Sequence, residues 1–402
     1  MRSAPWWAVA AAAVSLATGG CGDDSAGDGG TPSSGGALPA GGTGGQSPVG
    51  GTGGQPMVGG SGGQPTVGGT GGTPLPVTGG SAGVPATAGG SGGAPPGCAS
   101  DCGSHKWACW PMPNPVGSGL PNPAQYTDGG DGTVLDELTC LTWQQTPPSG
   151  DFTWDEGLQY CDDLTLGGYD DWRLPTRIEL TSIMDFTAAR TKVDASAFPD
   201  APGGFHRTSS DWILTITQTG AGAGNDFAWA FNMSDGIVSN AYSKTGRSAV
   251  PRCVRGNGAG EAPSDPAVAP PNLYMVGAPG EVVDNYTGLV WQQGYSETRL
   301  SHDAAIEYCA SLDLNGQAWR LPSIRELATL VDEAQVAPAI DRTAFPDTQY
   351  GSRSNDWYWA SHQAVGTTAG WAINFDDGFT GFNVGDPGDW NYFTEAWAKC
   401  VR

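Results

Sequence analysis

The cysteines of this 402-residue chain are its most informative reactive residues, because metal sites and disulfides differ in the spacing of their cysteines along the sequence. A cysteine metal site needs paired ligands. No C-x-x-C motif is present, and Cys98-x3-Cys102 has no second pair or His-x3-His to complete it. Of the nine cysteines, Cys21 follows an N-terminal apolar run and is treated separately below. The remaining even number predicts four disulfides, as is usual for an exported protein.

Other side chains give little indication of catalysis. The four histidines do not fall at matched positions, and G-x-S-x-G, H-E-x-x-H and P-loop motifs are absent. We therefore expect a protein that is not an enzyme and has no cofactor, apart from a candidate Ca²⁺ site. The candidate ligands are Asp356, Asp376 and Asp377. Carboxylates suit this hard cation, but their spacing fits no EF-hand, and turn formation is the simpler interpretation.

Aromatic side chains late in each half are candidates for a ligand-binding face. Loops on a rigid scaffold usually carry binding residues, and aromatic rings offer large, rigid contact surfaces. The candidate rings are Trp212, Trp357, Trp359, Trp371 and Trp390. Most of them lie after residue 272, so we expect the last part of the chain to be the binding part.

The N-terminus predicts export, and the segment after it predicts a flexible tether. Arg2 precedes an apolar run that is too short for a membrane-spanning helix. Residues 1–21 resemble a lipoprotein signal in which Cys21 is lipidated; the alternative is an ordinary secretory signal with an incidental cysteine. Residues 22–97 contain repeats such as GGTGGQPMV, which cannot bury a core and predict a disordered Gly-rich stalk.

The rest of the chain is an internal duplication. The motifs WQQ, YC, WRLP, AFPD, DW, DG and CVR occur twice in the same order. Trp143 corresponds to Trp291 by a shift of 148, and Cys253 to Cys400 by a shift of 147. The predicted segments are a cysteine-rich bridge, a first copy, a linker and a second copy, at 98–125, 126–256, 257–272 and 273–402.

Each copy has the pattern of an α+β domain. A short strand ends in WQQ, an amphipathic helix carries YC, and a second helix begins after LP. There Thr176 or Ser323, with a glutamate three residues later, predicts a capping box. Short strands rich in Trp, Phe and Ile follow. We expect Trp143, Trp172 and their counterparts to pack in the core, and Arg173 to pair with Glu179.

The duplication also predicts which cysteines pair, since one pair recurs in both copies. The predicted pairs are Cys161–Cys253 and Cys309–Cys400. Each would join the first helix of a domain to its last strand across a loop of roughly 90 residues, worth about 4–5 kcal/mol. Cys140 has no counterpart. Its predicted partner is one of Cys98, Cys102 and Cys109, with the other two paired together.

The ordered set of W-Q, YC, DWRLP, FP and CVR motifs resembles the Lcl C-terminal domain family, in two tandem copies. That family is similar to the C-type-lectin-like fold. The resemblance therefore implies two tandem C-type-lectin-like domains after the stalk. Its members are surface or secreted proteins, so it implies binding or adhesion without specifying a ligand. Known relatives bind sulfated glycans, which is at odds with the acidity of this chain, and the lectin triplets EPN and QPD are absent.

The net charge of −23 argues against binding to nucleic acid. Taken together, the sequence predicts an exported, lipid-anchored protein of the outer membrane or cell surface. Its tandem domains would bind an extracellular glycan or surface protein, in adhesion. Two alternatives stay open: a secreted protein without the anchor, and a structural envelope protein that docks on a protein partner and binds no carbohydrate.

Overall fold

The computed structural model describes residues 106–212, 226–256, 269–351, 356–382 and 393–402. The predicted signal, the predicted lipidation site Cys21, the predicted stalk, Cys98, Cys102 and Trp390 lie outside these residues, and the predictions made for them stay predictions. Both copies belong to one compact unit, Val84–Arg402. Within the described residues, no helix is both long and apolar enough to cross a membrane.

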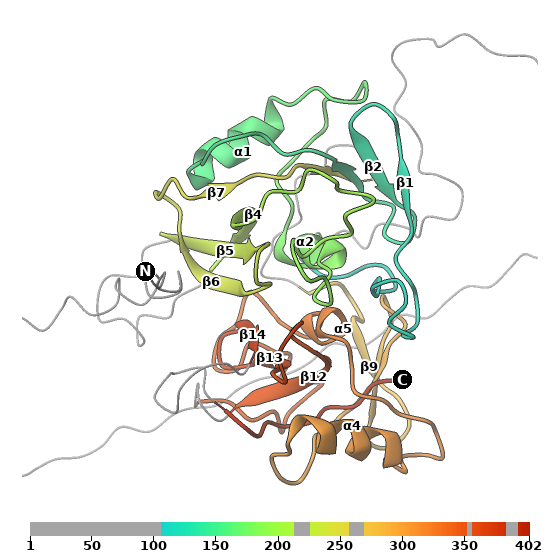
Figure 1. Ribbon diagram of the computed structural model, residues 1–402. Coiled ribbons are helices and arrows are strands. Elements are labelled where there is room, and N and C mark those ends of the chain that lie inside the picture. Colours follow the sequence, from blue (N-terminus) through green and yellow to red (C-terminus); the bar gives the residue numbers. More distant parts are fainter. Residues whose placement is uncertain (1–105, 213–225, 257–268, 352–355, 383–392) are drawn as a thin grey trace, which may run out of the picture. The chain divides into compact units, whose positions relative to one another are not determined.

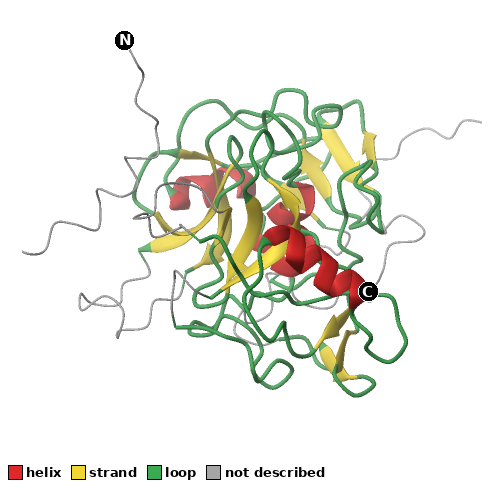
Figure 2. Ribbon diagram, turned by 60° about the horizontal axis from the view of Figure 1, so that its bottom comes forward, coloured by secondary structure: helices red, strands yellow, loops and turns green. Residues whose placement is uncertain are grey.

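The two copies repeat the same order of elements (Figure 1). The first copy consists of β1 (Tyr126–Asp128), β2 (Thr133–Asp136), β3 (Thr142–Gln144), α1 (Trp154–Asp162), α2 (Arg177–Ile183), β4 (Phe205–Asp211), β5 (Phe227–Asn232), β6 (Val238–Ser243), β7 (Ala249–Val250) and β8 (Val254–Arg255). The second consists of β9 (Tyr274–Val276), β10 (Glu281–Asp284), β11 (Val290–Gln292), α4 (His302–Ser311), α5 (Ile324–Ala328), β12 (Trp357–Gln363), β13 (Gly370–Asn374) and β14 (Thr380–Phe382). Short helices and strands are joined by long loops (Figure 2). The structure is thus mostly sheet with few helices, which agrees with the predicted α+β class.

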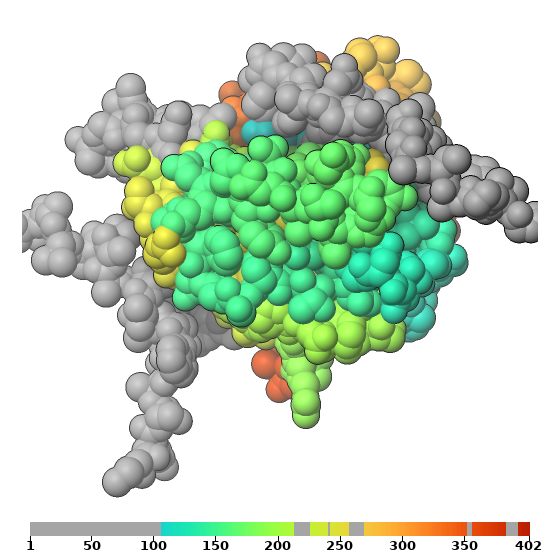
Figure 3. Space-filling model, turned by 90° about the horizontal axis from the view of Figure 1, so that it is seen from above, coloured from blue at the N-terminus to red at the C-terminus, as the bar shows by residue number. Residues whose placement is uncertain are grey.

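Three sheets organise these strands. The first copy begins and ends in a four-stranded antiparallel sheet of order β1-β2-β3-β8. The second copy has the matching sheet β11-β10-β9, in which Val401 bridges to Trp291 in the position of β8. The third sheet has seven strands in the order β12-β13-β14-β6-β5-β4-β7, so it continues from one copy into the other. In the space-filling view of Figure 3, the segments of the first copy form a continuous surface.

Local signals explain the helices. Thr176 accepts a hydrogen bond from the backbone of Glu179, and the Glu179 side chain accepts one from the backbone of Thr176, which confirms the capping box before α2. Ser323 and Glu326 form the same box before α5. Each glutamate also accepts two hydrogen bonds from an arginine, with Arg173 at 2.7 and 2.5 Å from Glu179. The predicted ion pair therefore fixes the end of a short helix.

The core confirms the packing role of the paired tryptophans. Trp143 and Trp291 are fully buried, and Trp172 and Trp319 are nearly so. The disulfides Cys161–Cys253 and Cys309–Cys400 are both formed, and each ties the first helix of a copy to the segment at its end. Cys109 and Cys140 are disulfide-bonded too. Because the prediction for Cys140 involves Cys98 and Cys102, its partner stays a prediction.

How the copies meet was not predicted from the sequence, and the structure relates them by a local two-fold axis. Val238 of β6 pairs antiparallel with Thr380 of β14, and these residues are counterparts in the duplication. Antiparallel pairing of identical positions is the geometry of an isologous dimer interface, here within one chain. The copies also share one hydrophobic core, which includes Met184 and Trp229 from the first copy and Val331 and Trp371 from the second.

Two glycines allow this close approach. A Cβ atom on Gly236 would lie 2.7 Å from the Trp371 ring, and one on Gly378 would lie 3.0 Å from the Trp229 ring. Gly236 and Gly378 are counterparts with positive φ angles of 88° and 79°. Each copy therefore places a tryptophan over the turn glycine of the other, at a position that only glycine fits.

Arginines cross the same interface in both directions. Arg177 of α2 donates to the carbonyl oxygens of Ala328 and Val331, at 3.2 and 3.1 Å, and pairs with Glu333 at 2.9 Å. Arg325 of α5 donates to the carbonyl oxygen of Met184, the counterpart of Val331. Both arginines are buried. Each one satisfies carbonyl groups at the end of a helix in the other copy, where cations are favoured.

Each copy also buries an aspartate as the last residue of the second strand of its first sheet. Asp136 accepts hydrogen bonds from the backbone of Leu138 and Thr139. Burial raises its pKa to about 6, although these hydrogen bonds and the field of Arg325 act in the opposite direction. Burial also raises the pKa of its counterpart, Asp284.

The raised pKa of Asp136 predicts how stability depends on pH. Between roughly pH 4 and pH 6 the folded state holds this proton and the unfolded state releases it, so stability should fall as the pH rises through that window. In Asp136→Asn this decrease in the free energy of unfolding, which amounts to up to about 3 kcal/mol across the window, should disappear. Urea denaturation from pH 4 to pH 7 tests this, with Asp128→Asn on the exposed end of β1 as control. An unchanged slope in Asp136→Asn would contradict it.

Candidate functional site

The predicted ligand face of tryptophans is not supported, because the described rings are buried. Trp357 and Trp359 point from β12 into one cluster with Phe393, while Tyr358 between them points into the shared core. Trp371 packs against Phe186 of the other copy, with ring centroids 5.0 Å apart. Trp212 is buried as well. Alternate residues of a strand face opposite sides, and here both sides of β12 are covered by protein.

Two of the predicted calcium ligands, Asp376 and Asp377, lie in the turn between β13 and β14, while the third, Asp356, is buried directly before β12. The Asp377 carboxylate accepts a hydrogen bond from the backbone of Phe379, and the backbone of Asp376 donates to the side chain of Asn374. Asp235, the counterpart of Asp377, accepts from Ile237 in the same way. These are the hydrogen bonds of turn-forming residues. The described part of the chain contains no group of three or more metal-ligating side chains, so the calcium prediction gains no support.

A pocket of about 630 Å³ lies in the second copy, at residues that the sequence did not suggest. One wall is the loop after β11, and the other is the segment that follows Arg342. The lining residues are Gly294, Tyr295, Ser296, Glu297, Arg342, Pro346, Asp347, Thr348, Gln349 and Tyr350. Both walls follow motifs that occur in both copies, WQQ and AFPD, so the repeated framework brings these side chains together.

Hydrogen bonds and ring contacts join the two walls. The Gln349 side chain donates to the Tyr295 hydroxyl at 2.5 Å, and the Gln349 backbone donates to the hydroxyl of buried Tyr358 at 2.8 Å. The Tyr295 ring packs edge-on against Trp397, 5.1 Å between centroids. Beside them, the Arg342 guanidinium lies 5.7 Å from the Tyr350 ring, which is 40% exposed. The pocket therefore combines a tyrosine hydroxyl that is held by a hydrogen bond, that of Tyr295, with the accessible ring of Tyr350.

Such a pocket suits a ligand that has both apolar faces and hydroxyl groups. Aromatic rings contact the faces, and amide, hydroxyl and charged groups fix the orientation. Glu297 and Asp347 supply carboxylates, and Arg342 supplies a guanidinium. The arrangement can bind and orient a polar molecule. A sugar ring meets this description.

The first copy lacks these side chains. The counterparts of Tyr295, Arg342, Gln349 and Tyr350 are Pro147, Ala195, Pro202 and Gly203. Proline, alanine and glycine offer neither an aromatic ring nor a hydrogen-bonding side chain. The two copies thus share the same scaffold, but only the second copy has the pocket side chains. Comparing TQY after one AFPD with APG after the other would have drawn attention to these positions.

A buried lysine contacts the loop that forms the first wall of the pocket. Burial lowers the pKa of Lys399 to about 7, and the Asp347 carboxylate offsets this in part. Its ammonium group donates to backbone carbonyls of the first wall. The counterpart in the first copy is Arg252, which is also buried.

Comparison with known proteins identifies the repeated unit. The family model of the Lcl C-terminal domain matches the chain twice, over residues 132–255 and 280–400. These ranges agree with the two copies seen in the duplication and cover most of the described residues. No curated protein matches the chain.

Proposed function

Because the chain belongs to the Lcl C-terminal domain family, in two tandem copies, we propose that it is an extracellular binding protein that acts in adhesion. The ligand is a glycan or a protein of another surface, and the second-copy pocket is where it binds. In this proposal the domains are lectin-like variants of the C-type-lectin fold. The stalk and a lipid on Cys21 tether them to the outer membrane or cell surface, with a secreted form as the alternative.

The pocket is the single observation that carries this proposal. Tyr350 offers an accessible ring, and Tyr295 and Gln349 hold each other in place at 2.5 Å, so a ligand would meet a preformed surface. Side chains of both charges line it, which suits a neutral polar ligand better than a strongly charged one. The buried tryptophans have no part in this site.

The binding prediction is that Tyr350→Ala weakens glycan binding at least tenfold, because it removes the accessible ring from the pocket. The full chain is first tested on a glycan array, with and without Ca²⁺, and affinities for any bound glycan are then measured by titration calorimetry. Tyr169→Ala is the matched control, since Tyr169 is a 38% exposed tyrosine of the first copy. It should bind like the unmodified protein. Equal affinities of both variants would refute the pocket as the site.

A structural role in the envelope is the second candidate function. Edge strand β9 favours it, because Met275 and Val276 are 51% and 72% exposed, whereas their counterparts in β1 are Thr127 and Asp128. An apolar edge strand suits contact with protein, and a charged one discourages it. An empty glycan array together with capture of an envelope protein, lost in Val276→Asp, would support this role over the first.

A further inference from the structure

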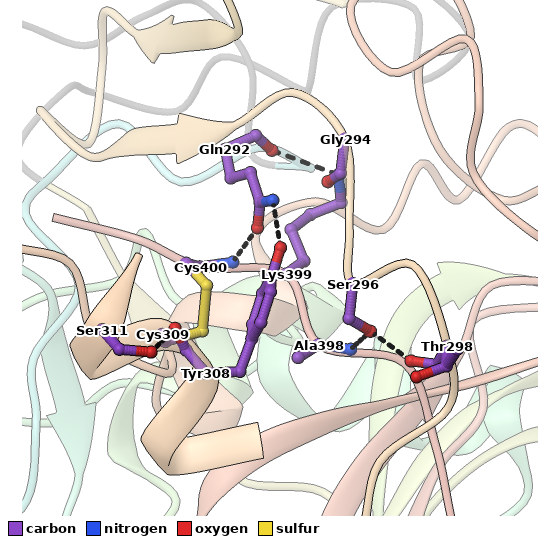
Figure 4. Close-up of a disulfide and its surroundings, with 10 residues drawn as sticks. All are labelled: Gln292, Gly294, Ser296, Thr298, Tyr308, Cys309, Ser311, Ala398, Lys399 and Cys400. Carbon is purple, nitrogen blue, oxygen red and sulfur yellow. Dashed lines mark hydrogen bonds between the residues drawn. A yellow bond between two sulfur atoms is a disulfide. The ribbon is translucent and has the colours of Figure 1, made fainter. Parts of the chain in front are cut away.

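The ammonium group of Lys399 is buried against the first wall of the pocket. Its three N–H donors meet three consecutive carbonyl oxygens, those of Gln292 at 3.2 Å, Gln293 at 2.9 Å and Gly294 at 2.6 Å. Figure 4 shows Lys399 between this loop and the Cys309–Cys400 disulfide. An ammonium group has three donors and no acceptor, so the protonated form fits this cage fully.

The same nitrogen touches the second wall. It lies 4.6 Å from the centroid of the Phe345 ring, which directly precedes the wall residues from Pro346 to Tyr350. The first wall also has backbone contacts to the segment that carries the lysine, between Ser296 and Ala398 at 2.8 Å. One buried cation therefore contacts both walls of the pocket, through carbonyl groups on one side and an aromatic face on the other.

No carboxylate forms an ion pair with this ammonium among the described residues. The charged group that acts on it is Asp347, on the second wall, and burial outweighs that attraction. From α4, Tyr308 faces the same loop and accepts a hydrogen bond from the Gln292 side chain at 2.8 Å. The disulfide beside the lysine does not titrate. Loss of the proton would leave one carbonyl without a donor and weaken the contact with the ring.

The first copy provides a comparison. Arg252 occupies the same position, donates to the carbonyl oxygens of Gln144 and Gln145 at 2.8 and 2.7 Å, and lies 4.9 Å from the Phe198 ring. Burial lowers the pKa of Arg252 as well, to about 9, so this guanidinium keeps its charge to a higher pH than the Lys399 ammonium does. The residue that titrates near neutral pH thus occurs in the copy that has the pocket, and the cation that persists to higher pH in the copy that lacks the pocket side chains.

We propose that Lys399 is a positioning residue of the pocket, whose protonated ammonium holds the two walls together, so that the pocket loosens when the proton is lost. The proposal rests on the proposed function in taking this pocket as the ligand site. It adds pH-dependent control, in which the pocket is ordered at mildly acidic pH and relaxed above neutral pH.

The test uses the full chain without ligand, so its result is independent of whether a glycan is ever found. Hydrogen exchange of backbone amides in 293–297 and 347–350 is measured at pH 6 and pH 8 and divided by the intrinsic exchange rates. We expect about tenfold lower protection at pH 8 in the unmodified chain, and a change within twofold in Lys399→Arg. In Arg252→Lys, the loop after β3 should acquire the same pH dependence.

A ¹³C-lysine NMR titration identifies the group responsible, because the Lys399 signal is absent from Lys399→Arg. We expect it to titrate well below the other lysines, together with the loss of protection. Protection that is equal at the two pH values, or that falls equally in Lys399→Arg, would overturn the proposal. Lys399→Met should lack protection at both pH values; if it does not fold, the arginine variant and the NMR titration still decide.

Discussion

Replacing Arg177 by methionine should lower the free energy of unfolding by about 3–5 kcal/mol, which is a large part of the stability of an ordinary domain. The side chain is buried, pairs with Glu333 at 2.9 Å and donates to two carbonyl groups of the other copy. Removing it leaves a buried carboxylate and two carbonyl oxygens without their donor. Urea denaturation measures the loss.

Two further variants make this test specific. Arg190→Met replaces an exposed arginine of the same copy and should change stability by less than about 0.5 kcal/mol. Arg177→Met combined with Glu333→Leu should recover much of the lost stability, because the double variant leaves no unpaired charge. If Arg177→Met and Arg190→Met cost the same, the arginine does not hold the copies together.

Removing one disulfide should have an effect of similar size. Cys309→Ser with Cys400→Ser opens a loop of 91 residues, and the chain-entropy model gives about 4–5 kcal/mol for such a loop. Removing Cys161 and Cys253, 92 residues apart, should cost nearly the same and serves as the internal comparison. Denaturation under non-reducing conditions gives both values. Losses below about 1 kcal/mol would show that packing alone closes each domain.

Features that depend on neighbouring residues were predictable from the sequence. The capping boxes need only Thr176 and Glu179, or Ser323 and Glu326, which are three positions apart. The two disulfides followed from the duplication, because a cysteine pair that recurs in both copies is expected to pair within each. The burial of Trp143 and Trp291 followed in the same way from their equivalent positions.

Features that depend on distant segments were not predictable. The aromatic run of β12 indicates a strand, but whether Trp357 is covered depends on Phe393, which no local pattern connects to it. The arginines that cross between the copies are not counterparts, since Arg177 aligns with Ile324 and Arg325 with Ile178, so the duplication concealed their common role. The pocket needs two loops, about 50 residues apart, to meet.

The bridge before the first copy contacts the second copy, and this affects how a force on the N-terminal side of the chain is distributed. The Asn114 side chain donates to Glu326 in α5 of the second copy at 3.0 Å, and Arg325 donates to the Pro113 carbonyl at 2.8 Å. A pull on the chain from the N-terminal side of residue 106 therefore reaches the second copy through these contacts as well as the first copy through the backbone. Both copies then resist such a pull together, instead of unfolding one after the other.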